Sequence, residues 1–143
     1  MMVRHYHLLS AGSGPTARWH EAFPEGETLD PASLAARLKD AQRMQCVVWI
    51  GASDRQWPEQ LRRVLGGGSP LVRAVVLSSQ PQEREAIQAF RAGASGYGHS
   101  HGLPALLRDV GQVVERGGLW LGPGLMQRLL SAASVVLPAA QHV

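Results

Sequence analysis

The chain has 143 residues, a length that suits one compact domain with its own core. Hydrophobic residues make up 45% of it and charged residues 17%, which argues against disorder over most of the chain, and the single cysteine, Cys46, excludes an intrachain disulfide and a cysteine-based zinc site. The net charge of +3 comes almost entirely from arginines. These are scattered, with Arg62-Arg63 the only adjacent pair, so they indicate solvated helix faces rather than a nucleic-acid patch.

Hydrophobic periodicity and turn residues predict alternating strands and helices. In chain order the pattern predicts strand 3–9, helix 16–23, a very short strand 27–29, helix 31–43, strand 46–50, helix 58–65, strand 71–77, helix 82–92, strand 95–98, helix 103–116, an extended segment 119–121 and helix 123–133. Asp30-Pro31 is a typical helix start, and Gly93 is expected to end its helix in a left-handed conformation. The unbroken apolar run 46–50 indicates a strand buried on both faces, and the alternation as a whole indicates an α/β fold with a parallel sheet.

Motifs for common ligand chemistries are incomplete. Residues 11–15 (AGSGP) follow a strand but lack the third glycine of a dinucleotide loop and the Gly-Lys-Ser/Thr of a phosphate loop. The pairs His5/His7 and His99/His101 each have H-x-H spacing, which is able to start a metal site, but no carboxylate or thiol pattern completes one, so we expect surface or strand-flanking histidines. No nucleophile elbow is present, and Cys46 is expected to be a buried hydrophobe.

The sequence also bears on location. Neither a signal peptide nor an apolar run approaching the ~18 residues of a membrane span is visible, so we expect a cytoplasmic protein.

Three segments together resemble one known family. Residues 74–79 (AVVLSS), 89–97 (AFRAGASGY) and 117–123 (GGLWLGP) are similar to the second half of bacterial receiver domains, in particular those of the LuxR/NarL class of response regulators. The resemblance covers residues 71–130, whereas the first half matches only in its rhythm of strands and helices. It implies a flavodoxin-like (CheY-like), doubly wound, five-stranded parallel sheet of order 2-1-3-4-5 with helices on both faces.

The resemblance also implies where phosphorylation chemistry would lie, and the residues there lack the required groups. The magnesium-binding acidic pair falls at Ser10, Ala11 and Gly12, and residues 1–20 contain no aspartate or glutamate. The phospho-acceptor falls at Gly51, and the family's lysine falls at Ser100. We therefore expect a degenerate receiver, or pseudo-receiver, without a metal or a cofactor.

The switch positions of the family retain suitable residues. Its hydroxyl residue corresponds to Ser78 and its aromatic switch to Tyr97, although both are also typical of ordinary packing at a strand end. Asp54 was weighed as a substitute acceptor, but it lies three residues beyond Gly51 in an expected loop.

These observations give one leading hypothesis and two alternatives. The leading hypothesis is a non-enzymatic domain of signal transduction and transcription regulation, divided into a receiver-like domain (1–118) and a linker or extra helix (119–143). It would dimerise or dock a partner through the fourth helix, fifth strand and fifth helix (82–116), without membrane contact, and DNA would be bound only by a C-terminal helix-turn-helix domain that this chain lacks. The alternatives are small-molecule sensing in the vacated acidic pocket and an enzyme that uses His99 or His101 as its base.

Overall fold

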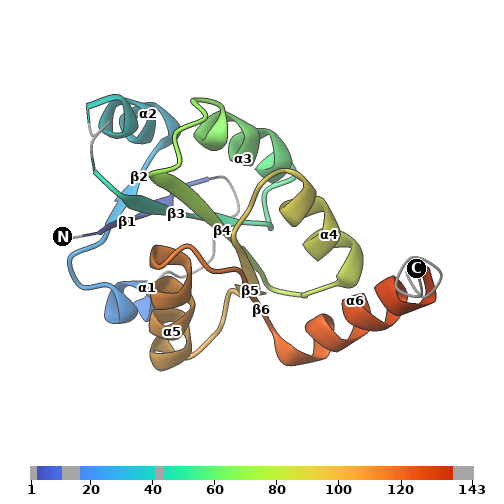
Figure 1. The fold of residues 1–143 in the computed structure, drawn as a ribbon. Helices are drawn as coiled ribbons and strands as arrows, with labels where there is room; N and C mark the ends of the chain where they lie inside the picture. The colour runs from blue at the N-terminus through green and yellow to red at the C-terminus, as the bar shows by residue number, and fades with distance from the viewer. Residues whose placement is uncertain (1–2, 11–16, 41–43, 137–143) are drawn as a thin grey trace.

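A parallel sheet lies between two layers of helices (Figure 1). The structure is a computed structural model, and it describes residues 3–10, 17–40 and 44–136. The strands are β1 (Arg4–Leu8), β2 (Glu27–Leu29), β3 (Cys46–Gly51), β4 (Val72–Ser78), β5 (Gly96–His99) and β6 (Trp120–Leu121). The helices are α1 (Ala17–Ala22), α2 (Pro31–Asp40), α3 (Trp57–Leu65), α4 (Glu83–Arg91), α5 (Pro104–Glu115) and α6 (Pro123–Val136).

The sheet has the predicted order with one strand more than predicted. Its order is β2-β1-β3-β4-β5-β6, and every neighbouring pair is parallel. The expected five-stranded sheet is therefore wrong by one strand, because the extended segment around Trp120 pairs with β5 as β6. Two features permit the pairing: Trp120 N donates to Ser95 O at 2.9 Å, and Gly98 leaves room for the Trp120 ring, which a Cβ atom there would approach to 3.2 Å.

The central strand β3 is buried on both faces, as predicted. Its side chains alternate between two hydrophobic clusters, with Cys46, Val48 and Ile50 on one face and Val47 and Trp49 on the other. The first face is covered by α2, α3, α4 and α6, and the second by α1 and α5 (Figure 1). Burial also raises the pKa of the Cys46 thiol to about 11, so this thiol has the character of a core hydrophobe.

Two helix boundaries lie where the sequence predicts a capping residue. Ser33 N donates to Asp30 Oδ1 at 2.7 Å, and Pro31 opens α2, as predicted. Gly93 follows α4 with φ +102°, a left-handed conformation that favours glycine, also as predicted. The expected end of α2 at residue 43 lies outside the described residues.

The segment beyond residue 118 packs on the rest of the fold. Leu121 of β6 and Leu125 of α6 are buried in the same cluster as Val48 and Tyr97. Helix α6 lies beside α4, as Figure 1 shows. Within the described residues, no helix has the length and apolar character needed to span a bilayer.

A glycine in α5 permits close packing of α1 against α5. A Cβ atom at Gly111 would come within 2.9 Å of Phe23 Cζ and 3.2 Å of His5 Cε1. We expect Gly111→Ala to destabilise the fold by about 1–2 kcal/mol despite the better helix propensity of alanine, because overpacking outweighs it. Gly124→Ala in α6, where a Cβ atom would meet nothing within 4 Å, is the matched control and should be neutral or stabilising. Urea unfolding measures both, and equal effects would contradict the packing argument.

Candidate functional site

The carboxyl ends of the central strands lie at one edge of the sheet. Strand β1 ends at Leu8, β3 at Gly51, β4 at Ser78 and β5 at His99, and these strands are neighbours in the sheet. The order of connection reverses between β1 and β3, which is where doubly wound folds bind their ligands. Gly51, Ser78 and Ser100, which the sequence singled out, therefore lie at one edge.

The positions implied for phosphorylation are placed at this edge. Gly51 is half-buried beside Leu77, and a Cβ atom there would meet only Ser53 Oγ, at 3.8 Å, so the position has space for a side chain. Ser100 is half-buried, and its N–H donates to Ser78 O at 2.8 Å. Ser10 is half-buried after β1, while Ala11 and Gly12 lie outside the described residues.

Asp54 has a structural role in the turn that leads into α3. Its Oδ1 accepts the Gln56 N–H at 2.8 Å, and its Oδ2 accepts from Gln60 Nε2 at 3.4 Å. Its carbonyl oxygen accepts the Trp57 N–H at 3.1 Å. These bonds provide acceptors for backbone N–H groups at the start of α3, and they engage both carboxylate oxygens of Asp54.

Tyr97 joins β5 to the start of α4. Its ring is fully buried, and its hydroxyl donates to Glu85 Oε1 at 2.6 Å and accepts the Gln82 N–H at 2.9 Å. Burial, followed by the hydrogen bond to Glu85, raises the pKa of Tyr97 to about 12. Nearby, Ser78 is buried, and its Oγ accepts the Gln80 N–H at 3.2 Å. Both switch-like residues are thus engaged in hydrogen bonds, and no motif in the sequence pointed to Glu85 as the partner of Tyr97.

His99 and His101 are exposed, as expected. Their ring centroids lie 5.5 Å apart, and His99 Nδ1 accepts the His101 N–H at 2.9 Å. Arg18 of α1 donates to His101 O at 2.5 Å, which ties α1 to the loop after β5. Across the described ranges, no three histidine, cysteine or acidic side chains gather into a group able to hold a metal ion.

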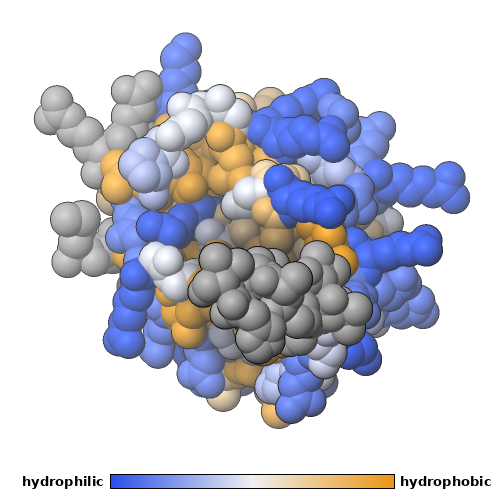
Figure 2. Space-filling view, turned by 45° about the vertical axis from the view of Figure 1, so that its right-hand side comes forward, coloured by the Kyte–Doolittle hydropathy of each residue, from blue (hydrophilic) through white to orange (hydrophobic). Residues whose placement is uncertain are grey.

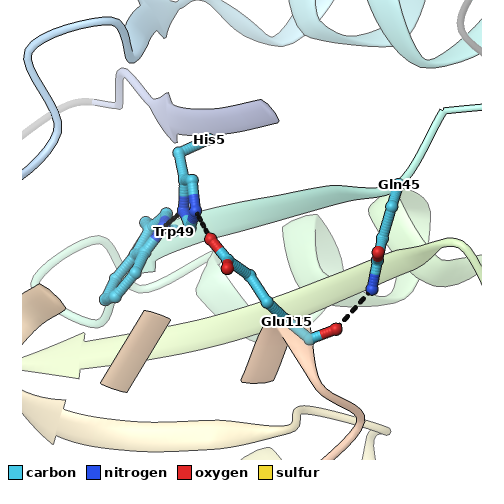
Figure 3. Close-up of polar contacts among 4 residues, drawn as sticks. All are labelled: His5, Gln45, Trp49 and Glu115. Atoms are coloured by element: carbon cyan, nitrogen blue, oxygen red, sulfur yellow. Dashed lines mark hydrogen bonds and ion pairs between the residues drawn. The ribbon is translucent and has the colours of Figure 1, made fainter. Parts of the chain in front are cut away.

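A buried polar network, shown in Figure 3, lies on the opposite half of β1. Trp49 Nε1 donates to His5 Nδ1 at 3.0 Å, and His5 Nε2 lies 2.5 Å from Glu115 Oε1. Because the indole N–H is only a donor, His5 Nδ1 is the acceptor, and Nε2 carries the proton that His5 donates to the carboxylate. Gln45 Nε2 donates to Glu115 O at 2.5 Å, so the end of α5 is held to the strands at two points.

His5 and His7 are buried, so the expectation of surface or strand-flanking positions is wrong for them. The ring of His5 stacks on Phe23 with centroids 4.2 Å apart, and His7 meets Trp19 edge-on at 5.3 Å. Both rings point to the α1 and α5 face, because alternate residues of a strand share a face. The helices that cover this face supply the aromatic partners, and the spacing of the histidines alone did not reveal them.

A cleft of about 630 Å³ lies near this network, at the amino end of β1. Its lining includes His5, Phe23, Arg108 and Glu115. The cleft is therefore at the opposite end of the sheet from Gly51, where the small-molecule alternative placed its pocket.

Comparisons with known proteins relate the chain to solved structures by fold. No protein-family model matches the chain, and no curated protein matches it. A two-component response regulator of the LuxR family from Aurantimonas sp. SI85-9A1 superposes with a TM-score of 0.69 at 16% identity, covering 92% of this chain and 99% of that one. A LuxR-family DNA-binding response regulator from Silicibacter pomeroyi gives a TM-score of 0.60 at 15% identity, with 85% and 98% covered.

A third similar structure is the isolated REC domain of RcsB from Salmonella enterica serovar Typhimurium, solved in the presence of phosphomimetic BeF3-. It gives a TM-score of 0.63 at 13% identity and covers 88% of this chain and 98% of that one. The chain thus has the CheY-like receiver fold that the sequence resemblance implied.

The buried histidines predict an acid-sensitive fold. Burial lowers the pKa of His5, and it lowers that of His7 from 6.5 to about 4. Between those values the unfolded chain binds more protons than the folded one, so stability falls as the pH falls from about 6.5 to about 4, by up to ~3 kcal/mol for His7. We expect His7→Phe to flatten this dependence in urea unfolding measured from pH 7 to pH 4. His101→Phe controls for a changed number of histidines, and an unchanged slope in His7→Phe would contradict the prediction.

Proposed function

We propose that this chain is a receiver-like signalling domain of the LuxR/NarL response-regulator class that acts without an aspartyl phosphate. The observation that carries the proposal is Gly51, which occupies the carboxyl end of the central strand β3 in a fold shared with receiver domains. Glycine has no group to phosphorylate. Since the position has space for a side chain, the glycine is not required there by packing.

The neighbouring positions support the same proposal. Phosphoryl transfer to a carboxylate depends on a metal ion and cationic groups that offset the charge of the transferred group. Magnesium prefers oxygen ligands from carboxylates, which Ser10 and the rest of residues 1–20 do not supply, and Ser100 replaces the lysine. Asp54 does not restore an acceptor, since both of its carboxylate oxygens are engaged at the start of α3.

Signalling would then depend on protein contacts, and we place these on α4, β5 and α5. Leu103 and Leu106, at the start of α5, are 64% and 41% exposed and give this face apolar side chains that a partner would bury. The bonds of Tyr97 to Glu85 and Gln82 fix the start of α4 on β5, so the face is rigid. Residues 1–118 would form the receiver-like domain, and 119–143, with α6, the connection towards a separate DNA-binding domain.

The loss of phosphorylation has a direct test. On incubation with acetyl phosphate and Mg²⁺ the chain should gain no phosphoryl mass, and with beryllofluoride and Mg²⁺ its amide chemical shifts should stay unchanged, because no acceptor carboxylate or metal site is available. The isolated REC domain of RcsB serves as the positive control. A phosphorylated aspartate identified by mass spectrometry, at Asp54 or elsewhere, would refute the proposal.

The contact face is tested by charge introduction. Leu103→Glu with Leu106→Glu should shift a self-associated population towards monomer, with an apparent Kd at least about tenfold weaker, because carboxylates would be desolvated in the interface. Sedimentation velocity over a concentration series measures this. Leu119→Glu is the control, since this leucine is 68% exposed but lies outside 82–116. If the Leu103/Leu106 variant and the Leu119 variant behave identically, this face is not the interface. The same conclusion follows if the wild type and the variants are equally monomeric and equally unable to bind a partner regulator.

A further inference from the structure

A narrow groove between α3 and α4 gathers arginines that are scattered in the sequence. The groove holds about 500 Å³ and is lined by Arg62 of α3 together with Arg84, Ile87, Gln88, Arg91 and Ala92 of α4 and its end. On α4, residues 84, 87, 88 and 91 follow the i, i+3, i+4, i+7 spacing that places side chains on one helix face. Figure 2 turns the side with α4 and α6 forward and shows long hydrophilic side chains standing around hydrophobic surface.

The groove has more positive charge than its own surroundings neutralise. Of its three arginines, only Arg62 has an ion pair among the described residues, with Glu59 at 3.1 Å, and both of those side chains are largely exposed. Arg84 and Arg91 are exposed without one. Glu85, which also lies on α4, accepts a hydrogen bond from Tyr97. Two guanidinium groups are therefore available for an acidic partner.

We propose that this groove docks an acidic amphipathic helix of a partner protein. Arg84 and Arg91 are seven residues apart, which is about 10 Å along a helix axis. A partner helix that lies along α4 presents carboxylates at the same interval when its acidic residues are also seven apart. Arginine suits such contacts, since its planar guanidinium binds a carboxylate through two parallel hydrogen bonds.

The floor of the groove favours a protein helix over a nucleic acid. Ile87 and Ala92 are half-buried and apolar, and they line the groove together with the arginines. An apolar side chain on the partner, three or four residues from its first acidic residue, would cover Ile87. A phosphate backbone has no group that uses such a floor.

This inference rests on the proposed function, in that it names the chemistry of a partner for a domain that signals by contact. It adds the outer side of α4 to the surface already proposed. Tyr97 anchors the start of this helix through Glu85 and Gln82, so a partner held by Arg84 would contact the part of α4 that is tied to the carboxyl edge of the sheet.

The test uses the full chain and a labelled, alanine-rich helical peptide with two glutamates seven residues apart and a leucine three residues after the first. Binding is followed by fluorescence anisotropy at low and high salt. The double variant Arg84→Glu/Arg91→Glu should bind the peptide about tenfold more weakly than the wild type, because two exposed ion pairs are lost and the new carboxylates face the glutamates of the peptide. A peptide with the second glutamate moved to five residues from the first should also bind more weakly, because its carboxylates lie on different faces.

The matched control is Arg4→Glu/Arg128→Glu, at two exposed arginines that lie outside the groove and outside 82–116. Each reversal lowers the net charge by 2, so both double variants change it from +3 to −1. Equal weakening in the two double variants would overturn the proposal, since net charge alone would explain it. A second result would also overturn the proposal: the wild type binds a short DNA duplex but not the peptide, and Arg84→Glu/Arg91→Glu loses the DNA binding. That result would assign the groove to nucleic acid.

The two proposals fail separately. Phosphorylation of the chain would refute the phosphate-independent function whatever the peptide does. Unweakened peptide binding in Arg84→Glu/Arg91→Glu, with both variants folded by circular dichroism, would refute the groove alone.

Discussion

The burial of β3 on both faces is the constraint on which the rest of the structure depends. Neither face of this strand meets water, so helices must cover both sides of the sheet. In such an arrangement the middle of the sheet is closed to ligands, and only the strand ends and the outer faces of the helices are accessible. Gly51, at a strand end, and the helix residues of the arginine groove lie in these accessible parts of the molecule.

Each face of the sheet also holds a polar group that ties a strand to a helix. On the α1 and α5 face, His5 receives the Trp49 N–H and contacts Glu115 near the end of α5. On the other face, the Tyr97 hydroxyl bonds to Glu85 at the start of α4. Buried polar groups are costly unless paired, so these bonds favour one placement of each helix. The position of α4 is therefore coupled to β5 through Tyr97.

The comparisons show a shared fold at low sequence identity. Structures of response regulators superpose on nearly the whole chain at only 13–16% identity. Such divergence is possible because the fold depends on the pattern of apolar residues, while phosphoryl transfer depends on individual carboxylates and a lysine. A sequence that keeps the pattern around Val48 and Val76 retains the fold even when a glycine stands at position 51.

The sequence pattern by itself determined the layered parallel sheet and most helix limits, and the family resemblance implied the order of its first five strands. Apolar runs, the Asp30 cap and Gly93 are local signals, because each depends only on residues that are close together in the sequence. The resemblance also implied that the family's acidic pair and lysine are absent from the carboxyl edge, which stays a prediction. Only the tertiary structure decided that Trp120 adds a sixth strand, that His5 is buried against Glu115, and that Arg62 lines one groove with Arg84 and Arg91. Each of these joins residues far apart in the chain, and such contacts are set by how helices pack on the sheet, for which no short stretch of sequence carries a signal.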